Sequence, residues 1–428
     1  MIGVGADVAA GGVPGGVPGE LRRRLGVGDA VLVGLGAMLG AGIFVALAPA
    51  ARAAGAGLLV ALAVAGVVAY CNATSSARLA ARYPASGGTY VYGRERLGPF
   101  WGWLAGWAFV VGKTASCAAM ALTVGSYVWP GQEHAVAVVA VVVLTAVNYA
   151  GVQKSAWLTR VIVAVVLVVL AAVVLAALAS GEAEASRLSV GGDVSFGGVL
   201  QAAGLLFFAF AGYARIATLG EEVRDPGRTI PRAIPLALGI TLVVYAAVAV
   251  AVLAVLGPGR LADATAPLAD AVRAAGVGWL VPVVRVGAAL AALGSLLALI
   301  LGVSRTTLAM ARDRRLPHFL AAVHPRFMVP HRAELAVGAV FAVLAATVDV
   351  RGAIGFSSFG VLVYYAIANA SAWTLTPGEG RPHRLIPVLG LAGCLTLAFA
   401  LPATSVIVGV VVLAVGAAVY GIRRTVAP

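Results

Sequence analysis

The feature that most constrains this chain is its succession of long apolar segments. An α-helix needs about 20 predominantly apolar residues to cross the hydrocarbon core of a bilayer, and most of these segments reach or approach that length. Only 11% of the 428 residues are charged, against about 25% in soluble domains. The pattern predicts an all-α polytopic membrane protein with twelve transmembrane helices. We expect them at about 29–52, 55–79, 98–129, 135–151, 157–179, 197–219, 232–256, 279–303, 334–349, 353–374, 386–402 and 404–422.

The basic residues indicate how these helices are oriented. If the N-terminus is cytoplasmic and the segments alternate, 23 of the 30 Lys and Arg residues fall on the inner side and six on the outer side. Such a bias is the positive-inside rule. It predicts a multi-pass protein of the plasma membrane with both termini in the cytoplasm. The net charge of +13 then reflects orientation in the lipid bilayer, and we expect no nucleic-acid partner.

Two of the apolar segments contain small residues where a membrane helix should be strongest. The first includes Gly40-Ala41-Gly42-Ile43, and the second includes Phe207-Phe208-Ala209-Phe210-Ala211-Gly212-Tyr213. In lipid every backbone N–H and C=O must be hydrogen-bonded, so a break is tolerated only where it is buried in protein or lines a cavity. Matching interruptions in two halves of a membrane protein indicate a binding site. The alternative is that these glycines only allow close helix packing.

The first break favours an anionic ligand. Glycines at 40 and 42 let the backbone leave the helix at little steric cost. A half-helix that starts again near Ile43 presents unpaired N–H groups and the positive end of its dipole. We therefore predict that Gly40, Ala41, Gly42 and Ile43 bind a carboxylate without help from Lys or Arg.

Lys113 is the one charged residue that this pattern places near the middle of a span. A charge at that depth costs at least about 2.5–3.5 kcal/mol, so a functional role is the first hypothesis. Its amine could bind and release a coupling proton, or its ammonium could stand where a sodium ion sits in sodium-coupled proteins. Alternatively, the side chain only braces the scaffold by bonding to exposed carbonyls.

No metal site or cofactor is expected. The three cysteines, Cys71, Cys117 and Cys394, show no metal-ligand spacing and read as small apolar residues in helix packing. The five histidines all fall in predicted loops or at loop edges. No partnered nucleophile is apparent either, so we do not expect an enzyme.

Several motifs occur together in a recognisable order. They are the glycine-rich first segment, Pro84-Ala-Ser-Gly-Gly-Thr-Tyr90, Phe208-Ala-Phe-Ala-Gly-Tyr213, the stretch from Gly220 to Ile234, Gly302-Val-Ser-Arg305, Leu316-Pro317 and His324-Pro-Arg326. In kind and order they resemble amino acid permeases of the amino acid–polyamine–organocation (APC) superfamily, nearest to bacterial relatives of the cationic amino acid transporters. The resemblance covers about residues 22–422.

This resemblance implies a LeuT-like fold of five plus five helices in inverted repeat, with helices 1 and 6 unwound and two peripheral helices. The implied organisation is a disordered cytoplasmic N-terminal tail (1–25), a first repeat (26–180), a second repeat (195–375), helices 11 and 12 (376–422) and a cytoplasmic C-terminal tail (423–428). It also implies a substrate site in which the ammonium group meets carbonyls near Ala37, Met38, Phe207, Phe208 and Phe210. The phenylalanines and Tyr213, next to Gly212, would form the wall of the side-chain pocket.

The implied function is secondary active transport of a small molecule, an amino acid, by alternating access. No Asp or Glu falls in the middle of a span, and a cationic side chain would need one, so we expect proton-coupled symport of neutral amino acids. The resemblance to relatives of the cationic amino acid transporters favours cationic substrates instead. Relatives often carry a buried lysine in the fifth helix, but 157–179 contains none. The two alternatives are that Lys113 replaces it or that the protein is an exchanger. A non-transporting amino acid sensor is the alternative from another class, and the oligomeric state is open.

Overall fold

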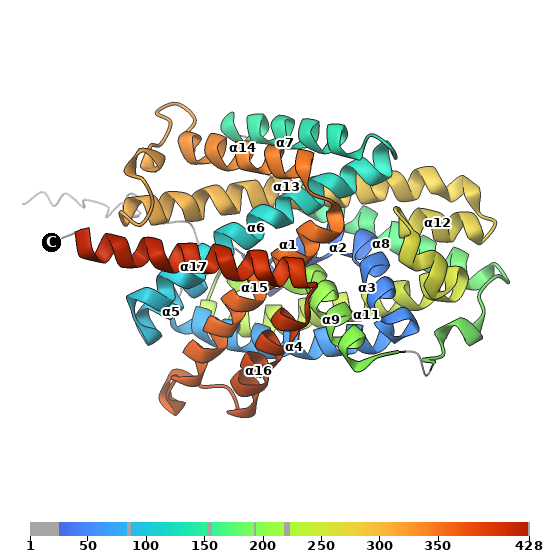
Figure 1. Cartoon of the computed structure of the whole chain (residues 1–428), viewed down its shortest axis with the longest axis horizontal. Coiled ribbons are helices and arrows are strands. Elements are labelled where there is room, and N and C mark those ends of the chain that lie inside the picture. The colour runs from blue at the N-terminus through green and yellow to red at the C-terminus, as the bar shows by residue number, and fades with distance from the viewer. Residues whose placement is uncertain (1–24, 84–86, 152–155, 192–193, 218–222, 427–428) are drawn as a thin grey trace, which may run out of the picture.

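The computed structural model describes residues 25–83, 87–151, 156–191, 194–217 and 223–426. The described residues form a bundle of helices that run mostly along one direction, with α5 at one end and α12 at the other (Figure 1). The α-helices are α1 (Val27–Met38), α2 (Ala41–Val45), α3 (Leu47–Ala54), α4 (Leu58–Arg82), α5 (Thr89–Leu97), α6 (Pro99–Val128), α7 (Glu133–Tyr149), α8 (Ala156–Ala179), α9 (Phe196–Phe210), α10 (Ala214–Ala217), α11 (Pro226–Asp263), α12 (Pro267–Ala274), α13 (Val281–Arg312), α14 (His331–Thr347), α15 (Val350–Trp373), α16 (Leu385–Ala400) and α17 (Ala403–Val426). The short 3-10 helices are η1 (Gly55–Gly57), η2 (Ala185–Leu188), η3 (Ala211–Tyr213), η4 (Gly278–Leu280), η5 (His318–Ala321) and η6 (Pro377–Glu379).

The described part of each of the twelve predicted apolar segments lies mostly in one helix or in a run of consecutive helices. Among the described residues, nine helical runs are long and apolar enough to cross a membrane, and α7 and α16 are shorter apolar helices. α14 has 17 residues. The all-helical architecture is therefore confirmed, whereas the twelve crossings and the inverted repeat remain predictions.

Helix α5 is the element that apolar periodicity did not predict. Its sequence is largely polar, so it gives no hydropathy signal, but Tyr90 and Tyr92 on its inner face are buried. The Thr89 amide donates to the hydroxyl of Tyr364 at 3.0 Å, and the Tyr90 hydroxyl donates to Asp313 at 2.7 Å. These bonds fix α5 to α15 and to the end of α13.

The centre of the bundle is built on α6 and α15, whose apolar windows are 83% buried, whereas that of α17 is only 17% buried. Small residues allow the two central helices to approach. A β-carbon on Gly112 would lie 3.3 Å from the backbone of Gly360, and the hydroxyls of Ser116 and Ser357 are 2.6 Å apart. α6 and α15 thus form a close-packed support for the helices around them.

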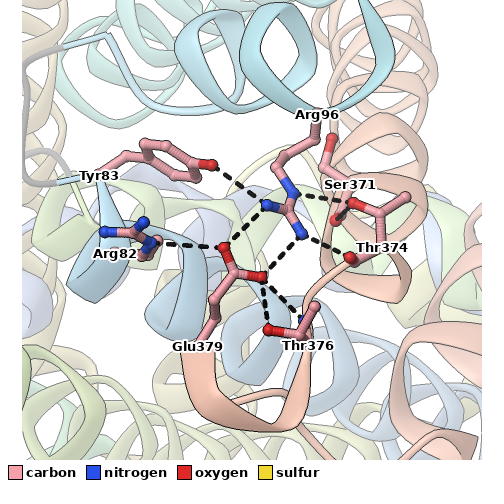
Figure 2. Close-up of polar contacts among 7 residues, drawn as sticks. All are labelled: Arg82, Tyr83, Arg96, Ser371, Thr374, Thr376 and Glu379. Carbon is pink, nitrogen blue, oxygen red and sulfur yellow. Dashed lines mark hydrogen bonds and ion pairs between the residues drawn. The ribbon is translucent and has the colours of Figure 1, made fainter.

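A cluster around Glu379 ties together three segments at the α5 end of the bundle (Figure 2). The Glu379 carboxylate accepts hydrogen bonds from Arg96 of α5 at 3.0 and 3.1 Å and from Thr376, and Arg82 of α4 lies 3.5 Å away. Arg96 also donates to the carbonyl and hydroxyl oxygens of Thr374, directly after α15. The ends of α4, α5 and α15 are therefore held by one carboxylate.

Ion pairs and backbone bonds also close the ends of the broken helices. At the α5 end, Asp29 of α1 pairs with Arg160 of α8, and the amide of Arg224 donates to the carbonyl of Leu25 at 2.8 Å. At the α12 end, Arg52 of α3 pairs with Asp263 at 2.7 Å. The first apolar segment is thus fastened at both ends.

Candidate functional site

The first break lies between α1 and α2, where the sequence predicted it. α1 ends at Met38, and Gly40 leaves the helix with φ −92° and ψ −146° before α2 begins at Ala41. α2 continues into α3 because Ala46 keeps helical torsions and its amide bonds to Gly42. The first amides of this continuing helix have no partner within it, which is the arrangement that favours an anion.

The second break is a change of helix type. α9 ends at Phe210, three residues follow as the 3-10 helix η3, and α10 begins at Ala214. The chain therefore departs from α-helical geometry over Ala211–Tyr213, at the position where the resemblance implied an unwound segment. A 3-10 turn shifts the hydrogen-bond register by one residue, so carbonyls near the junction become free to accept other donors.

The two breaks lie directly against each other, and glycines make this possible. A β-carbon on Gly212 would lie 2.4 Å from the carbonyl oxygen of Ala37 and 2.7 Å from the amide nitrogen of Met38. A β-carbon on Gly42 would lie 2.6 Å from Cα of Ala209. Both distances are too short for any residue but glycine. The two glycines therefore allow contact between two segments that lie about 170 positions apart in the sequence.

Side chains from neighbouring helices bond to the carbonyls at the breaks. The Tyr245 hydroxyl of α11 donates to Met38 and, at 3.1 Å, to Ala209. The Tyr365 hydroxyl of α15 donates to the carbonyl of Ala211 at 3.4 Å. In this way three carbonyls at the breaks, those of Met38, Ala209 and Ala211, find partners within the protein.

Lys113 reaches the second break. Its ammonium nitrogen lies 3.4 Å from the Ala211 carbonyl oxygen, the same oxygen that Tyr365 contacts. The side chain is only 6% exposed, and it forms no ion pair with any described residue. A buried cation on α6 is therefore in contact with the backbone of η3.

Aromatic rings enclose the second break. Tyr213 stacks on Tyr365 with ring centroids 4.9 Å apart, and Phe207 meets the same ring edge-on at 5.9 Å. Phe210 packs against Tyr245 at 5.1 Å. The aromatic residues predicted to form the pocket wall thus pack with two further tyrosines, Tyr245 and Tyr365.

Two further groups support the first break. The Ser295 hydroxyl of α13 donates to Gly36 at 3.4 Å, and a β-carbon on Gly40 would collide with it. Beyond the break, the Tyr127 hydroxyl of α6 donates to the Phe44 carbonyl at 2.8 Å and accepts from the Leu268 amide of α12 at 3.4 Å. α12 is thereby linked to α2 through one phenol.

The predicted site residues gather in one buried region. Ala37 and Gly212 are partly buried, and the others are buried, namely Met38, Gly40, Ala41, Gly42, Ile43, Lys113, Phe207, Phe208, Phe210 and Tyr213. Sequence reasoning missed Tyr127, Tyr245 and Tyr365. A signal for the tyrosines existed, because a phenol within a span must find a hydrogen-bond partner. Among the described residues, no group of three or more His, Cys, Asp or Glu side chains could hold a metal ion.

Comparison with known proteins decides the family. The sequence model described as "Amino acid permease" matches residues 25–421. The chain belongs to the amino acid permease family. This places it among transporters rather than enzymes, and it agrees with the glycine-rich breaks and the motifs that pointed to the APC superfamily.

Three relatives show the range of this permease's similarity. It is 78% identical over 411 residues to a Mycobacterium tuberculosis protein named as an uncharacterized transporter, covering 96% of this chain and 93% of the relative. It is 26% identical over 433 residues to the branched-chain amino acid permease BcaP of Bacillus subtilis, covering 94% and 93%. It is 30% identical over 389 residues to the human cationic amino acid transporter 4, covering 85% of this chain and 61% of the relative.

Proposed function

We propose that this permease is a secondary active transporter that moves amino acids across the plasma membrane by alternating access. The observation that carries the proposal is the contact between the two breaks, where Gly212 lies against Ala37 and Met38. Irregular backbone at this depth is costly unless it serves a binding site or lines a cavity. Family membership supports transport of an amino acid.

In the proposed site the substrate carboxylate binds the amides of Gly40, Ala41, Gly42 and Ile43. The substrate ammonium lies near carbonyls at the ends of α1 and α9, namely those of Ala37, Met38, Phe207, Phe208 and Phe210. Gly212 allows the second break to lie close to the first, and Tyr213 forms part of the wall of the proposed side-chain pocket. No cationic side chain is required for the carboxylate, because helix N-terminal amides and the dipole suffice.

We propose neutral amino acids as the substrates. Lys113 is the charged side chain in contact with the breaks, and it would repel a cationic ligand. The similarity to a relative named as a branched-chain amino acid permease supports this preference. Similarity to proteins named as cationic amino acid transporters favours the alternative substrate class, so arginine uptake is the competing outcome.

Lys113 is our candidate for proton coupling. Because its ammonium group contacts the Ala211 carbonyl of η3, loss of its proton would weaken its bond to a segment that would move in the proposed alternating-access cycle. The alternatives are an exchanger that needs no coupling ion, and a lysine that only braces η3 against α6. The three hypotheses are distinguished by whether the wild type and a Lys113 variant can concentrate substrate inside a vesicle.

The proposal includes the membrane arrangement expected from the charge pattern. Twelve spans would place both termini in the cytoplasm, with residues 26–180 and 195–375 as inverted five-helix repeats of a LeuT-like fold and 376–422 as two peripheral helices. The largely exposed surface of α17 supports its peripheral position. The α5 end of the bundle would then face the cytoplasm and the α12 end the outside.

Counterflow in proteoliposomes tests the function. Vesicles loaded with unlabelled neutral amino acid should take up the same labelled amino acid, because exchange through one alternating-access site needs no gradient of a second ion. Binding without counterflow would identify a non-transporting sensor and overturn the proposal.

The same vesicles test the role of Lys113. With an inward proton gradient, the wild type should concentrate substrate, whereas Lys113→Met should lose concentrative uptake and retain counterflow. If Lys113→Met concentrates substrate as well as the wild type, Lys113 is a brace. Gly239→Ala is a suitable control, because a β-carbon at position 239 meets nothing within 4 Å.

A further inference from the structure

A second buried charge lies outside the proposed substrate site. Lys113 and Glu334 are the two residues with ionisable acidic or basic groups among the buried polar side chains of the described chain. Glu334, in the first turn of α14, is 0% exposed. Neither of its carboxyl oxygens has a hydrogen-bond partner among the described residues. Such a group needs an explanation, because an isolated ionised carboxylate is very costly to bury.

The face of α14 that carries Glu334 is otherwise apolar. Val337 and Phe341, one and two turns further along, belong to a buried cluster shared with α6, α7 and α13. Gly338 lies against α7, since a β-carbon there would be 2.8 Å from the hydroxyl oxygen of Thr145. The Thr145 hydroxyl is itself buried and has no partner among the described residues. Glu334 therefore extends an otherwise apolar face of α14, and this face packs against the hydroxyl of Thr145 on α7.

The electrostatic influences on this carboxyl group oppose each other. Burial favours the neutral form. The field of Arg305 on α13 and the N-terminal end of α14 both favour the carboxylate. The other ionisable groups on α14 and on the elements packed against it are Lys113, Cys117 and Tyr127 of α6, Glu133, His134 and Tyr149 of α7, Arg285 and Arg312 of α13, His318 of η5, and His331 and Arg332 of α14 itself. None of them forms a hydrogen bond with the carboxyl oxygens of Glu334.

We propose that Glu334 is a proton-binding site. In the conformation shown, its carboxyl group is protonated, so the buried oxygens carry no net charge. When the helices around it separate, the O–H bond breaks, the proton passes to water, and the carboxylate pairs with the guanidinium of Arg305. The site is distinct from Lys113, which lies on α6 against η3.

The location allows this proton to influence the breaks. α13 carries both Arg305 and Ser295, and the Ser295 hydroxyl bonds to the carbonyl of Gly36 next to the first break. A new ion pair at Arg305 would act on the same helix that supports Gly40. This last step rests on the proposed transport function, whereas the protonation of Glu334 does not.

Infrared difference spectroscopy of the purified full-length protein tests the proton site without any transport assay. The wild type at neutral pH should show the carbonyl stretch of a protonated carboxylic acid, and this band should vanish on going to alkaline pH. Glu334→Gln should lose the band, while Glu182→Gln, at an exposed position, should keep it. An unchanged band in Glu334→Gln, or no band in the wild type at neutral pH, would overturn the proposal.

A second variant keeps the test informative if Glu334→Gln does not fold. Arg305 is exposed, so Arg305→Gln should fold, and removal of its charge should shift the loss of the band to higher pH. An unshifted titration would contradict the proposed pairing. Loss of the band on adding Na⁺ at constant pH would assign the site to a metal cation and overturn the proton assignment.

The effect on transport is measured by counterflow with equal pH on both sides. Glu334→Gln should keep the wild-type rate at acidic pH and lose the decline that the wild type shows as Glu334 deprotonates. A wild type that exchanges no amino acid would refute the proposed function and leave the infrared result standing.

Discussion

At the scale of single residues, the glycines decide how closely the two breaks approach. Gly212 admits the backbone of Ala37 and Met38, and Gly42 admits that of Ala209. Any side chain at these positions would push the broken helices apart. The proposed substrate site therefore depends on residues that have no functional group of their own.

Gly212→Ala should weaken substrate binding more than it lowers the stability of the rest of the protein. Insertion of a methyl group into a tightly packed position costs about 1–3 kcal/mol, which corresponds to a roughly 5- to 150-fold loss when it acts on one binding equilibrium. We expect the dissociation constant of a neutral amino acid, measured by ligand-dependent thermal shift, to rise within that range.

Gly239→Ala on α11 is the matched control, because it adds the same methyl group where nothing lies within 4 Å. Its affinity should equal that of the wild type. Equal affinities for Gly212→Ala and Gly239→Ala would show that the contact between the breaks does not shape the site.

Some residues at the breaks could be predicted from the sequence and others could not. Gly40 and Gly212 could be identified because a glycine in a membrane helix interrupts an otherwise apolar pattern. The hydrogen bonds from Tyr245 and Tyr365 could not be identified in this way, because each hydroxyl bonds to a carbonyl that lies more than 30 residues away in the sequence. Local patterns carry no information on which buried phenol meets which free carbonyl.

At the scale of elements, the link from α6 through Tyr127 to α2 and α12 is a candidate outer closure. One hydroxyl accepts from the Leu268 amide and donates to the Phe44 carbonyl. Because α12 touches the broken segment through this group, its position and that of α2 should change together.

Tyr127→Phe should weaken this closure. A hydrogen bond of this kind contributes about 0.5–1.5 kcal/mol, so we expect a two- to ten-fold rise in the apparent KM for counterflow, with little change in the maximal rate. Ser126→Ala is the control, since that hydroxyl bonds only within its own helix, to Leu122. A fall in maximal rate at unchanged KM would contradict this role for Tyr127.

The Glu379 cluster provides a pH-dependent prediction for α5. Hydrogen bonds from the Thr376 amide, then from Arg96 and the Thr376 hydroxyl, lower the pKa of Glu379 from 4.5 to about 2. A depressed pKa means that the carboxylate stabilises the folded state fully above the pKa of the unfolded chain, and that this stabilisation is lost as the pH falls from about 4.5 toward 2.

The measurement is the difference in Tm between the wild type and Glu379→Gln as a function of pH. The wild type should be more stable by a constant margin from neutral pH down to about 5, and the margin should shrink at lower pH. A margin that varies between pH 6 and 8 would show that another group is responsible.

The same element shows the limit of hydropathy. All twelve apolar segments became helical because their length and composition leave few alternatives in lipid. α5 was missed because Thr89–Leu97 is mostly polar, and it is held by partners on α15, on η6 and beyond α13. Its helical state therefore depends on tertiary contacts that no local pattern contains.

At the scale of the whole molecule, the described helices bring two breaks, a buried lysine and an aromatic wall into one buried region. Both ends of the broken first segment are fastened, by Asp29 with Arg160 and by Arg52 with Asp263. We interpret this arrangement as a conformation closed at both ends. In the proposed alternating-access cycle, these ion pairs would open one end at a time.

In the proposed site, the breaks bind a carboxylate through backbone amides and exclude a cationic side chain. Equilibrium binding to the purified protein of leucine, its amide leucinamide and arginine tests this most directly. Loss of a charge-assisted hydrogen-bond set costs about 1.5–3 kcal/mol or more, so leucinamide should bind at least about ten-fold more weakly than leucine, and arginine should bind more weakly still. Equal affinities for leucine and leucinamide would show that the amides do not recognise the carboxylate. An affinity for arginine higher than that for leucine would show that the site accepts a cationic side chain.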